Sequence, residues 1–121
     1  MIRGIRGATT VDNDTEEAII EATMEILSAM ISANDLKEDD VASVFFTTTP
    51  DLTSAYPARG ARRLGWTQTA LMGGVEMDVK GSIPRCIRIL IHWNTDKPQN
   101  EIKHIYLRDA VKLRPDWSAN K

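Results

Sequence analysis

Hydrophobic and polar positions follow two different periods along the chain, which divide it into extended and helical segments. Residues 2–10 combine isoleucine and threonine with glycine, and this pattern predicts a strand. Behind Asp14, apolar residues recur at every third or fourth position to about Asn34, which is typical of a helix with one buried face. Asp14 precedes the first turn and Glu17 follows it by three residues. We therefore expect Asp14 to cap this helix, with Glu17 as its capping-box partner.

The rest of the chain predicts more strands and a second, shorter helix. Residues 41–48 are rich in β-branched and aromatic side chains, and turn-forming residues follow them at 49–51. Residues 57–65 begin with proline and end with glycine, the order typical of a short helix. Gly73 and Gly74 mark a bend or a close approach of the backbone. Further strands are expected at residues 68–73, 83–93 and 102–107.

This order of elements predicts a single α+β domain over residues 1–121, in which one sheet carries its helices on one face. The length is typical of one domain and is enough to bury a hydrophobic core. A sheet of this size has edges with unpaired backbone groups, and such edges invite pairing with another chain. We therefore expect the protein to form an oligomer.

Charged residues are distributed unevenly along the chain, although the net charge is only −2. Residues 12–40 carry ten acidic side chains against the single base Lys37, whereas residues 57–88 carry six bases against Glu76 and Asp78. Nucleic acids bind broad basic surfaces, and here the basic segment adjoins an acidic one. Nucleic acid is therefore a poor partner for this chain, and a small anion is a better one.

Cysteine usage and hydropathy bear on where the protein works. The single cysteine, Cys86, cannot form an internal disulfide, so a cytoplasmic location is the default. No segment approaches the ~20 apolar residues of a membrane-spanning helix. Even the most apolar run, residues 87–93, is interrupted by Arg88 and His92. The first residues are charged early and lack an apolar run, which argues against a signal peptide.

Arg88 is the most informative single residue, because it interrupts an otherwise apolar strand at residues 86–91. A buried guanidinium costs several kcal/mol unless an anion meets it. Two partners are possible: a nearby carboxylate such as Glu76, or a ligand that brings its own negative charge. Glu76 and Asp78 share a face if their segment is extended, and one of them is available to orient a hydroxyl or to balance an arginine.

Other chemistries lack suitable residues. His92 and His104 have no cysteine or carboxylate at metal-ligand spacing, so we expect no metal site. Cys86 lies in an apolar strand, where a thiol is usually inert. Arg3 and Arg6 differ in parity within the first strand, so at most one of them faces a given pocket. The remaining arginines and glutamate, without a nucleophile, predict either binding alone or a reaction that needs only positioning and electrostatics.

Motifs spread over nearly the whole chain carry a family likeness. They are Ile2-Arg-Gly-Ile-Arg-Gly-Ala-Thr-Thr-Val11, Thr49-Pro-Asp-Leu52, Glu76-Met-Asp-Val79, Cys86-Ile-Arg88, His104-Ile-Tyr-Leu107 and Leu113-Arg-Pro-Asp116. In this order they resemble the trimeric bacterial chorismate mutases. The resemblance implies a mixed β-sheet with a long and a short helix, and a homotrimer that forms a pseudo-α/β-barrel with its sites between subunits. It also implies isomerisation of chorismate to prephenate on the shikimate route to phenylalanine and tyrosine, without a cofactor.

The resemblance also implies roles for single residues. Of the two N-terminal arginines it selects Arg6, which with Tyr106 would hold the enolpyruvyl carboxylate of chorismate. Arg88 would donate to the ether oxygen of the breaking C–O bond, and Glu76 would accept from the ring hydroxyl. Gly73 stands where some members have a cysteine near that hydroxyl, so a backbone group or water would replace this contact. Further pocket residues implied by the resemblance are Tyr56, Ala58, Arg59, Arg62, Leu71 and Met72, with Leu113 and Arg114 in a tail that closes over the entrance.

The chemistry of this reaction agrees with the residues present. A [3,3] rearrangement is unimolecular and needs no nucleophile. Negative charge grows on the ether oxygen in the transition state, and a fixed guanidinium binds that charge more strongly than it binds the ground state. Two alternatives from other classes stay open. One is a carboxylate-binding trimer of the enamine/imine deaminase kind, which would have to activate a water. The other is a non-catalytic metabolite-binding module in which Arg6, Arg62 and Arg88 only hold an anion.

Overall fold

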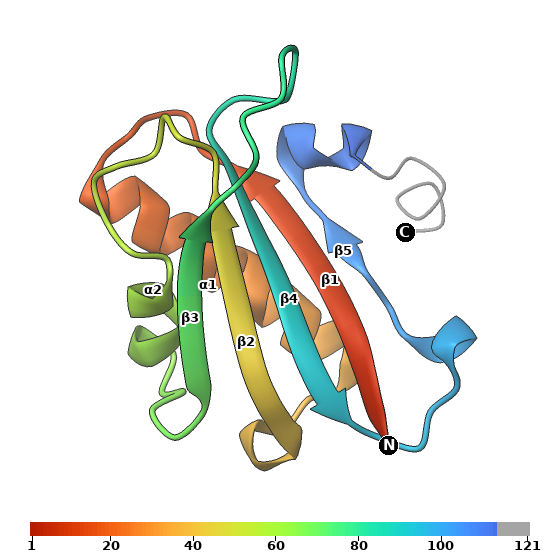
Figure 1. Ribbon diagram of the computed structural model, residues 1–121. Helices are drawn as coiled ribbons and strands as arrows, with labels where there is room; N and C mark the ends of the chain where they lie inside the picture. The colour runs from red at the N-terminus through yellow and green to blue at the C-terminus, as the bar shows by residue number, and fades with distance from the viewer. Residues whose placement is uncertain (114–121) are drawn as a thin grey trace.

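A five-stranded mixed sheet forms the framework of the protein, and two helices pack on one of its faces (Figure 1). The computed structural model describes residues 1–113. In this part of the chain, no helix is long and apolar enough to cross a membrane. The elements are β1 (Ile2–Thr10), α1 (Glu16–Asn34), β2 (Val41–Thr48), α2 (Ala58–Arg63), β3 (Ala70–Val75), β4 (Cys86–Asn94) and β5 (Ile105–Tyr106), with 3₁₀ turns at Glu38–Asp40, Gln99–Glu101 and Arg108–Lys112.

The strands lie in the order β3-β2-β4-β1-β5. Strands β1 and β2 both run antiparallel to the central strand β4. At the two outer positions the pairing is parallel, with β3 beside β2 and β5 beside β1. The predicted α+β class, with one sheet and helices on one face, is confirmed.

The long helix α1 is not capped by Asp14, so that prediction was wrong. The N-cap is Thr15, whose hydroxyl oxygen accepts a hydrogen bond from the N–H of Ala18 at 3.1 Å. The Asp14 carboxylate instead accepts the backbone N–H groups of Thr53 at 3.0 Å and Ser54 at 3.1 Å. Aspartate and threonine are both suitable caps. Because the Asp14 carboxylate is hydrogen-bonded to the loop after β2, the next residue, Thr15, caps the helix instead.

This arrangement makes the Asp14 carboxyl more acidic. Partial loss of solvent raises its pKa, but the hydrogen bonds from Thr53 and Ser54 outweigh that effect, so the pKa lies below its usual value. The Thr53 hydroxyl adds a further bond at 2.9 Å to the second carboxylate oxygen. A charged group therefore fastens the loop after β2 to the start of α1.

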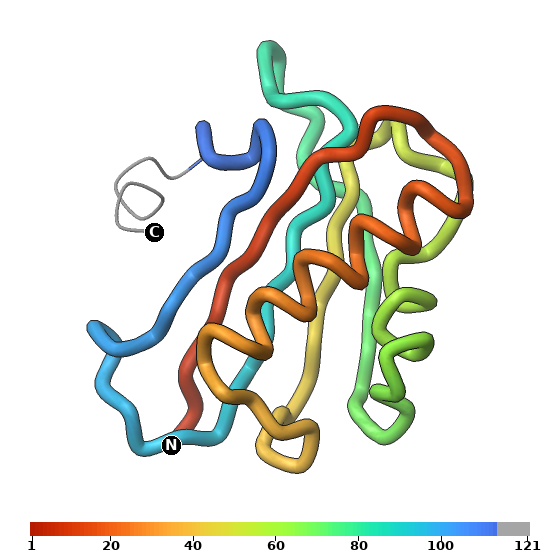
Figure 2. The backbone as a smooth tube through the Cα atoms, turned by 180° about the vertical axis from the view of Figure 1, so that it is seen from behind, coloured from red at the N-terminus to blue at the C-terminus, as the bar shows by residue number. Residues whose placement is uncertain are grey.

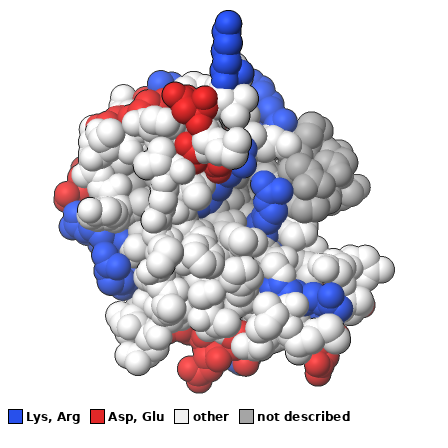
Figure 3. Space-filling model, viewed as in Figure 1, with Lys and Arg blue, Asp and Glu red and all other residues white. Residues whose placement is uncertain are grey.

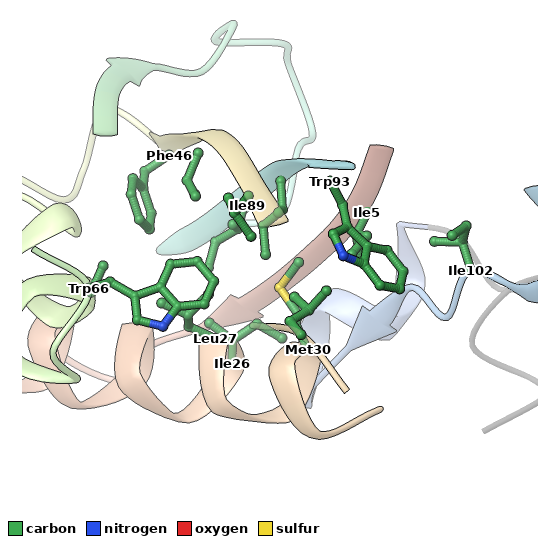
Figure 4. Packing of buried hydrophobic residues seen from close by; sticks show 14 residues of the cluster. Ile5, Ile26, Leu27, Met30, Phe46, Trp66, Ile89, Trp93 and Ile102 are labelled. Atoms are coloured by element: carbon green, nitrogen blue, oxygen red, sulfur yellow. The ribbon is translucent and has the colours of Figure 1, made fainter. Parts of the chain in front are cut away.

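The hydrophobic core lies between α1 and the sheet, as Figure 4 shows. Ile26, Leu27 and Met30 of α1 pack against strand residues such as Ile5 and Ile89, and all five are at most 2% exposed. Each such side chain stabilises the fold by about 1.5–3 kcal/mol through burial. Phe46, Trp66, Trp93 and Ile102 belong to the same cluster.

Strand β4 begins later than the sequence predicted, at Cys86. Pro84 has no N–H to give to a ladder, and Arg85 adopts a left-handed φ of 48°, which turns the chain just before the strand. Gly73 and Gly74 lie within β3, so of the two interpretations, a bend or a close approach of the backbone, the bend was wrong.

Strand β5 keeps only two residues of the predicted strand at 102–107. A side chain of α1 is hydrogen-bonded to the backbone just before β5. The Asn34 amide accepts the Lys103 N–H and donates to the Lys103 carbonyl, both at 2.9 Å. The His104 Nδ1 atom accepts the N–H of Arg6 at 3.0 Å. Side chains therefore form hydrogen bonds with backbone groups that a longer β5 would have used, and the pairing of β1 with β5 is limited to two residues.

The face of the sheet opposite α1 and α2 is called the open face. Figure 1 views this face, and Figure 2 shows α1 lying across the strands on the other side. Figure 3 shows mostly uncharged side chains over it, with several basic groups among them. Strand register arranges its residues in rows across the sheet, of which one is Gly74, Thr47, Arg88, Ala8 and Tyr106, and the next is Met72, Phe45, Leu90 and Arg6.

Candidate active site

One row of the open face brings together residues that lie far apart in the sequence. Arg88 of β4 pairs with Thr47 of β2 and with Ala8 of β1. Ala8 pairs in turn with Tyr106 of β5. Since neighbouring strands lie about 4.8 Å apart, the backbones of Arg88 and Tyr106 are separated by about 10 Å. That separation fits a small ligand held at two points.

Arg88 meets Glu76 beside this row. The distance from Arg88 Nη1 to Glu76 Oε2 is 3.4 Å, and the two side chains are 35% and 26% exposed. The sequence left open whether a carboxylate of the chain or a ligand balances Arg88, and the structure shows the carboxylate. A strong charge-assisted hydrogen bond measures about 2.7–2.9 Å, so this contact is loose. The partly exposed guanidinium is therefore still accessible to a ligand.

Three neighbours orient the Glu76 carboxylate. The Thr47 hydroxyl donates to Oε2 at 3.0 Å, and the Met77 N–H donates to Oε1 at 3.1 Å. Arg88 is the third neighbour. The Glu76 backbone N–H donates to the Thr48 carbonyl at 2.8 Å, which extends the β2–β3 pairing by one residue. Backbone and side chain of Glu76 are both fixed.

Thr47 is the site residue that sequence reasoning missed. The alternation of residues 41–48 groups it with Ser43 and Phe45 on one face of a strand. Only the register between β2 and β4 brings that face beside Arg88, and register cannot be read from one strand alone.

A cavity of about 220 Å³, called the Arg88 cavity, opens beside Glu76 and Arg88. Leu113 lies at this cavity and packs against the cluster that contains Tyr106. Arg114, which the resemblance assigned to the same tail, lies outside the described residues. The lining residues are Thr49, Glu76, Met77, Val79, Ser82, Ile83, Cys86, Arg88 and Leu113.

The Cys86 thiol at this cavity is not a nucleophile. Burial raises its pKa, and the positive charge of Arg88 offsets that rise only in part. The thiol therefore stays protonated at neutral pH, whereas the thiolate is the reactive form. This agrees with the expectation of an inert cysteine.

The turn after β2 fixes the start of β4 and with it the position of Arg88. The Cys86 N–H donates to the Thr49 hydroxyl oxygen at 2.9 Å, and the Thr49 N–H donates to the Cys86 carbonyl at 3.0 Å. The Asp51 carboxylate accepts the Thr49 hydroxyl at 2.5 Å and the Arg85 N–H at 3.0 Å. Since Arg88 follows Cys86 by two residues, this network sets where its side chain starts.

Arg6 is the N-terminal arginine that reaches the open face. It lies one row from Arg88, and its alternate neighbour Ala8 shares the same face. Arg3 has the opposite parity to Arg6, and its Nε donates to the Lys97 carbonyl at 3.0 Å. The structure thus places on the open face the arginine that the resemblance selected.

Other predicted pocket residues gather around α2 and the outer edge of β3. A second cavity of about 550 Å³, called the edge cavity, includes Tyr56, Arg59 and Gly73 in its lining. Tyr56 is 76% exposed, and Arg59 forms an ion pair with Glu16 at 2.8 Å. The other lining residues are Thr48, Leu52, Thr53, Ser54, Ala55, Pro57, Gly74 and Val75.

Six predicted site residues among residues 1–113 line neither cavity: Arg6, Tyr106, Ala58, Arg62, Leu71 and Met72. Ala58 and Leu71 are partly buried against the main core. Arg62 is exposed on α2, and Met72 is 63% exposed on the open face. The Arg88 cavity and the edge cavity share no lining residue. A single chain therefore places Glu76, Arg88 and Leu113 at one cavity and Tyr56, Arg59 and Gly73 at another.

The two histidines make contacts with neighbouring protein groups. His92 Nδ1 is hydrogen-bonded with the Ser43 hydroxyl at 3.0 Å, and His104 Nδ1 accepts the Arg6 N–H at 3.0 Å. Among residues 1–113, no three histidine, cysteine, aspartate or glutamate side chains are grouped so that they could hold a metal ion.

Comparison with known proteins identifies the family. The sequence matches chorismate mutase type I over residues 2–117. The chain belongs to the chorismate mutase type I family. It is 53% identical over 117 residues to chorismate mutase AroH of Thermus thermophilus, covering 96% of each chain. It is 46% identical over 122 residues to chorismate mutase AroH of Bacillus subtilis strain 168, covering all of this chain and 96% of that one.

A solved chorismate mutase structure confirms the fold. The enzyme from Clostridium thermocellum superposes with a TM-score of 0.88 at 50% identity, covering 89% of this chain and 96% of the other. The predicted mixed sheet with a long and a short helix is therefore confirmed. So is the predicted function, an isomerase of the chorismate mutase type in aromatic amino acid biosynthesis. The deaminase and the non-catalytic alternatives are not favoured.

The open face suits chorismate mutase chemistry. The rearrangement transfers no proton and forms no covalent intermediate, so it needs no nucleophile, and the protonated Cys86 thiol at the Arg88 cavity is consistent with it. Gly73, which the resemblance placed near the ring hydroxyl of chorismate, lines the edge cavity together with its neighbour Gly74.

Proposed function

We propose that the chain isomerises chorismate to prephenate at a site that forms where the Arg88 cavity of one subunit meets the edge cavity of another. The observation that carries this proposal is the geometry of Arg88: a guanidinium fixed in a strand, one row of the sheet away from Arg6 and held loosely by Glu76. Chorismate is a dianion, and this part of the open face offers two arginines within reach of one small molecule.

Arg88 would accelerate the reaction through electrostatics. In the polarised transition state C–O cleavage runs ahead of C–C formation, so negative charge gathers on the ether oxygen. A preorganised donor aimed at such an oxygen is typically worth about 2.7–4 kcal/mol in rate. Arginine suits this role better than lysine, because its planar fork fixes the direction of the hydrogen bond as well as the charge.

The other open-face residues would position the substrate. Arg6 and Tyr106 would bind the enolpyruvyl carboxylate, since a guanidinium and a phenol both donate to carboxylates. Glu76 would accept a hydrogen bond from the ring hydroxyl and help to hold the reactive diaxial conformer. Holding the reacting atoms in this conformer removes an entropic part of the barrier.

The homotrimer predicted from the resemblance would complete the site. The Arg88 cavity, at about 220 Å³, is smaller than the roughly 300–1,000 Å³ of usual ligand pockets. The edge cavity carries Tyr56 and Arg59 on surfaces that a single chain leaves exposed. Exposed apolar side chains on the open face, among them Ile2, Phe45 and Met72, would be buried between subunits of a pseudo-α/β-barrel. A cytoplasmic location accords with a single, buried cysteine.

Two measurements test this proposal together. Incubation with chorismate should lower its ultraviolet absorbance, and a mass measurement in solution should give three times the chain mass of 13.5 kDa. Binding without turnover would identify a metabolite-binding module instead. Replacement of Arg88 by its uncharged isostere citrulline should abolish most of the rate, and undiminished turnover would contradict the role given to Arg88.

A further inference from the structure

We infer that Thr47 is a positioning residue of this site, which anchors the Glu76 carboxylate and prevents it from closing onto Arg88. The inference rests on the roles proposed for Glu76 and Arg88. It concerns a residue that touches neither the breaking bond nor the forming bond in that proposal. Thr47 would act through its two neighbours.

Thr47 lies between two neighbouring strands of the site and also contacts Glu76. Its backbone pairs with Arg88 of β4 on one side and with Gly74 of β3 on the other. Its hydroxyl donates to Glu76 Oε2 at 3.0 Å, and the same oxygen lies 3.4 Å from Arg88 Nη1. One carboxylate oxygen is therefore shared between a neutral donor and a cation.

The shared oxygen explains why the ion pair is loose. The second oxygen, Oε1, already accepts the N–H of Met77 at 3.1 Å, so the carboxylate is held at both ends by donors other than Arg88. With both oxygens hydrogen-bonded, the carboxylate gains less from moving toward the guanidinium. The Glu76–Arg88 distance of 3.4 Å is about 0.6 Å longer than a tight charge-assisted bond.

Loss of the hydroxyl would change where Arg88 points. Without Thr47 as donor, Oε2 is satisfied best by the guanidinium, and closing the gap engages the N–H that Arg88 would aim at the ether oxygen. A donor already bound to a full negative charge responds less to the partial charge that develops in the transition state. Thr47 would therefore preserve the part of the Arg88 interaction that exists only in the transition state.

The neighbourhood of Thr47 favours this task. A β-branched side chain in a strand has few χ1 states, so its hydroxyl keeps one direction. On the β3 side its partner is Gly74, where an added Cβ would meet no atom within 4 Å. No side chain at that position competes for the Thr47 hydroxyl, and the space above Gly74 stays open beside the carboxylate.

Thr47→Val tests the inference, because valine keeps the shape and removes the hydroxyl. We expect kcat for chorismate to fall about tenfold, the loss that corresponds to about 1.4 kcal/mol of transition-state stabilisation. KM should change less than kcat, and Thr47→Ser, which restores the hydroxyl, should stay within about twofold of the parent. Thr47→Ala takes the place of the valine variant if the latter does not assemble.

Thr69→Val is a matched control, because it removes a bond of the same kind elsewhere. The Thr69 hydroxyl donates to Glu38 Oε2 at 2.8 Å, and neither residue lines the Arg88 cavity or the edge cavity. We expect this variant to turn over chorismate like the parent. A tenfold loss at this control position would show that the assay reports general destabilisation, and would overturn the interpretation of Thr47→Val.

A double-mutant cycle with Glu76→Gln separates positioning from a structural role. Glutamine has no charge to attract Arg88, so adding Thr47→Val to Glu76→Gln should cost less than about twofold further. An equal tenfold loss in both backgrounds would overturn the inference, as would a Thr47→Val enzyme with parental kcat. These outcomes are distinct from failure of the proposed function, which would appear as absence of turnover in the parent or as undiminished turnover in the citrulline variant of Arg88.

Discussion

The two faces of β4 differ in their side chains: one face is apolar and buried, and the other carries a charged residue and is partly exposed. Ile87, Ile89 and Ile91 point toward α1 and are at most 2% exposed, whereas Arg88 and Leu90 between them face the other side and are only partly buried. The two sets differ by one position in an alternating strand. Stability is concentrated on the helix side, and charge is placed on the open side. Substitution of neighbouring residues should therefore affect different properties of the protein.

Arg88→Ala should have the largest effect of any single change on the open face. We expect kcat to fall about a hundred- to a thousandfold, because one preorganised donor to the developing oxyanion is lost. The free energy of unfolding should change by about 1 kcal/mol or less, since the partner carboxylate keeps two other donors. Arg88→Lys should recover only part of the rate. Steady-state kinetics measure the loss of kcat, and urea unfolding measures the free energy of unfolding. Parental kinetics in both Arg88 variants would show that the open face is not the catalytic face of β4.

Ile89→Ala, one residue along, should show the converse. Ile89 is 2% exposed within the main core, and shortening a buried isoleucine costs about 2–5 kcal/mol. At temperatures where the variant is folded, kcat should stay within about twofold of the parent. Urea unfolding at one fixed protein concentration measures the first effect, because assembly couples stability to concentration. A large kcat loss in fully folded protein would show that the two faces are not independent.

Glu76→Gln tests whether the carboxylate on the open face contributes to activity beside Arg88. It keeps the shape of the side chain and removes the charge, so kcat/KM should fall by about tenfold if the carboxylate orients the ring hydroxyl as an anion. Initial rates of the variant and the parent, measured from chorismate concentrations well below KM up to saturation, give kcat/KM and kcat for both enzymes. An unchanged value would show that the negative charge of Glu76 is not needed for the reaction.

Asp14→Asn should have the smallest effect, and only on stability against pH. Because hydrogen bonds from the loop after β2 hold the pKa of Asp14 below its usual value of 3.8, the native state favours the ionised form. That contribution is complete above pH 3.8 and is lost as the pH falls through the lower, folded-state pKa. Thermal melts between pH 2 and 6 should show a shallower acid limb in the variant. An identical limb would mean that this carboxylate does not contribute to acid unfolding.

Elements with strong local patterns could be predicted from the sequence. Helix α1 and strands β1 and β2 lie where periodicity and β-branched residues placed them. The failures lie where two residues compete for one role, as Asp14 and Thr15 do at the start of α1. They also occur where a distant side chain replaces backbone, as Asn34 does beside Lys103. Neither kind of competition has a signal in the local pattern.

Only part of the site could be predicted from the residues alone. A guanidinium in an apolar strand identified Arg88, and the need for an anion indicated Glu76 as one of two partners. The distance between them and the presence of Thr47 depend on the register of three strands, which alternation does not specify. The separate position of Tyr56 and Arg59 at another cavity likewise follows from tertiary packing.

The side chains that stop β5 have a consequence for how copies of this chain meet. An unpaired edge strand can pair with any other extended chain, because backbone N–H and C=O groups form hydrogen bonds whatever the sequence. Here the Asn34 amide and the His104 ring occupy those groups along the margin of the sheet. At this margin, the side chains discourage copies of the chain from pairing edge to edge into fibres. Contacts between copies at this margin are then made by side chains, which can distinguish the correct neighbour from a wrong one.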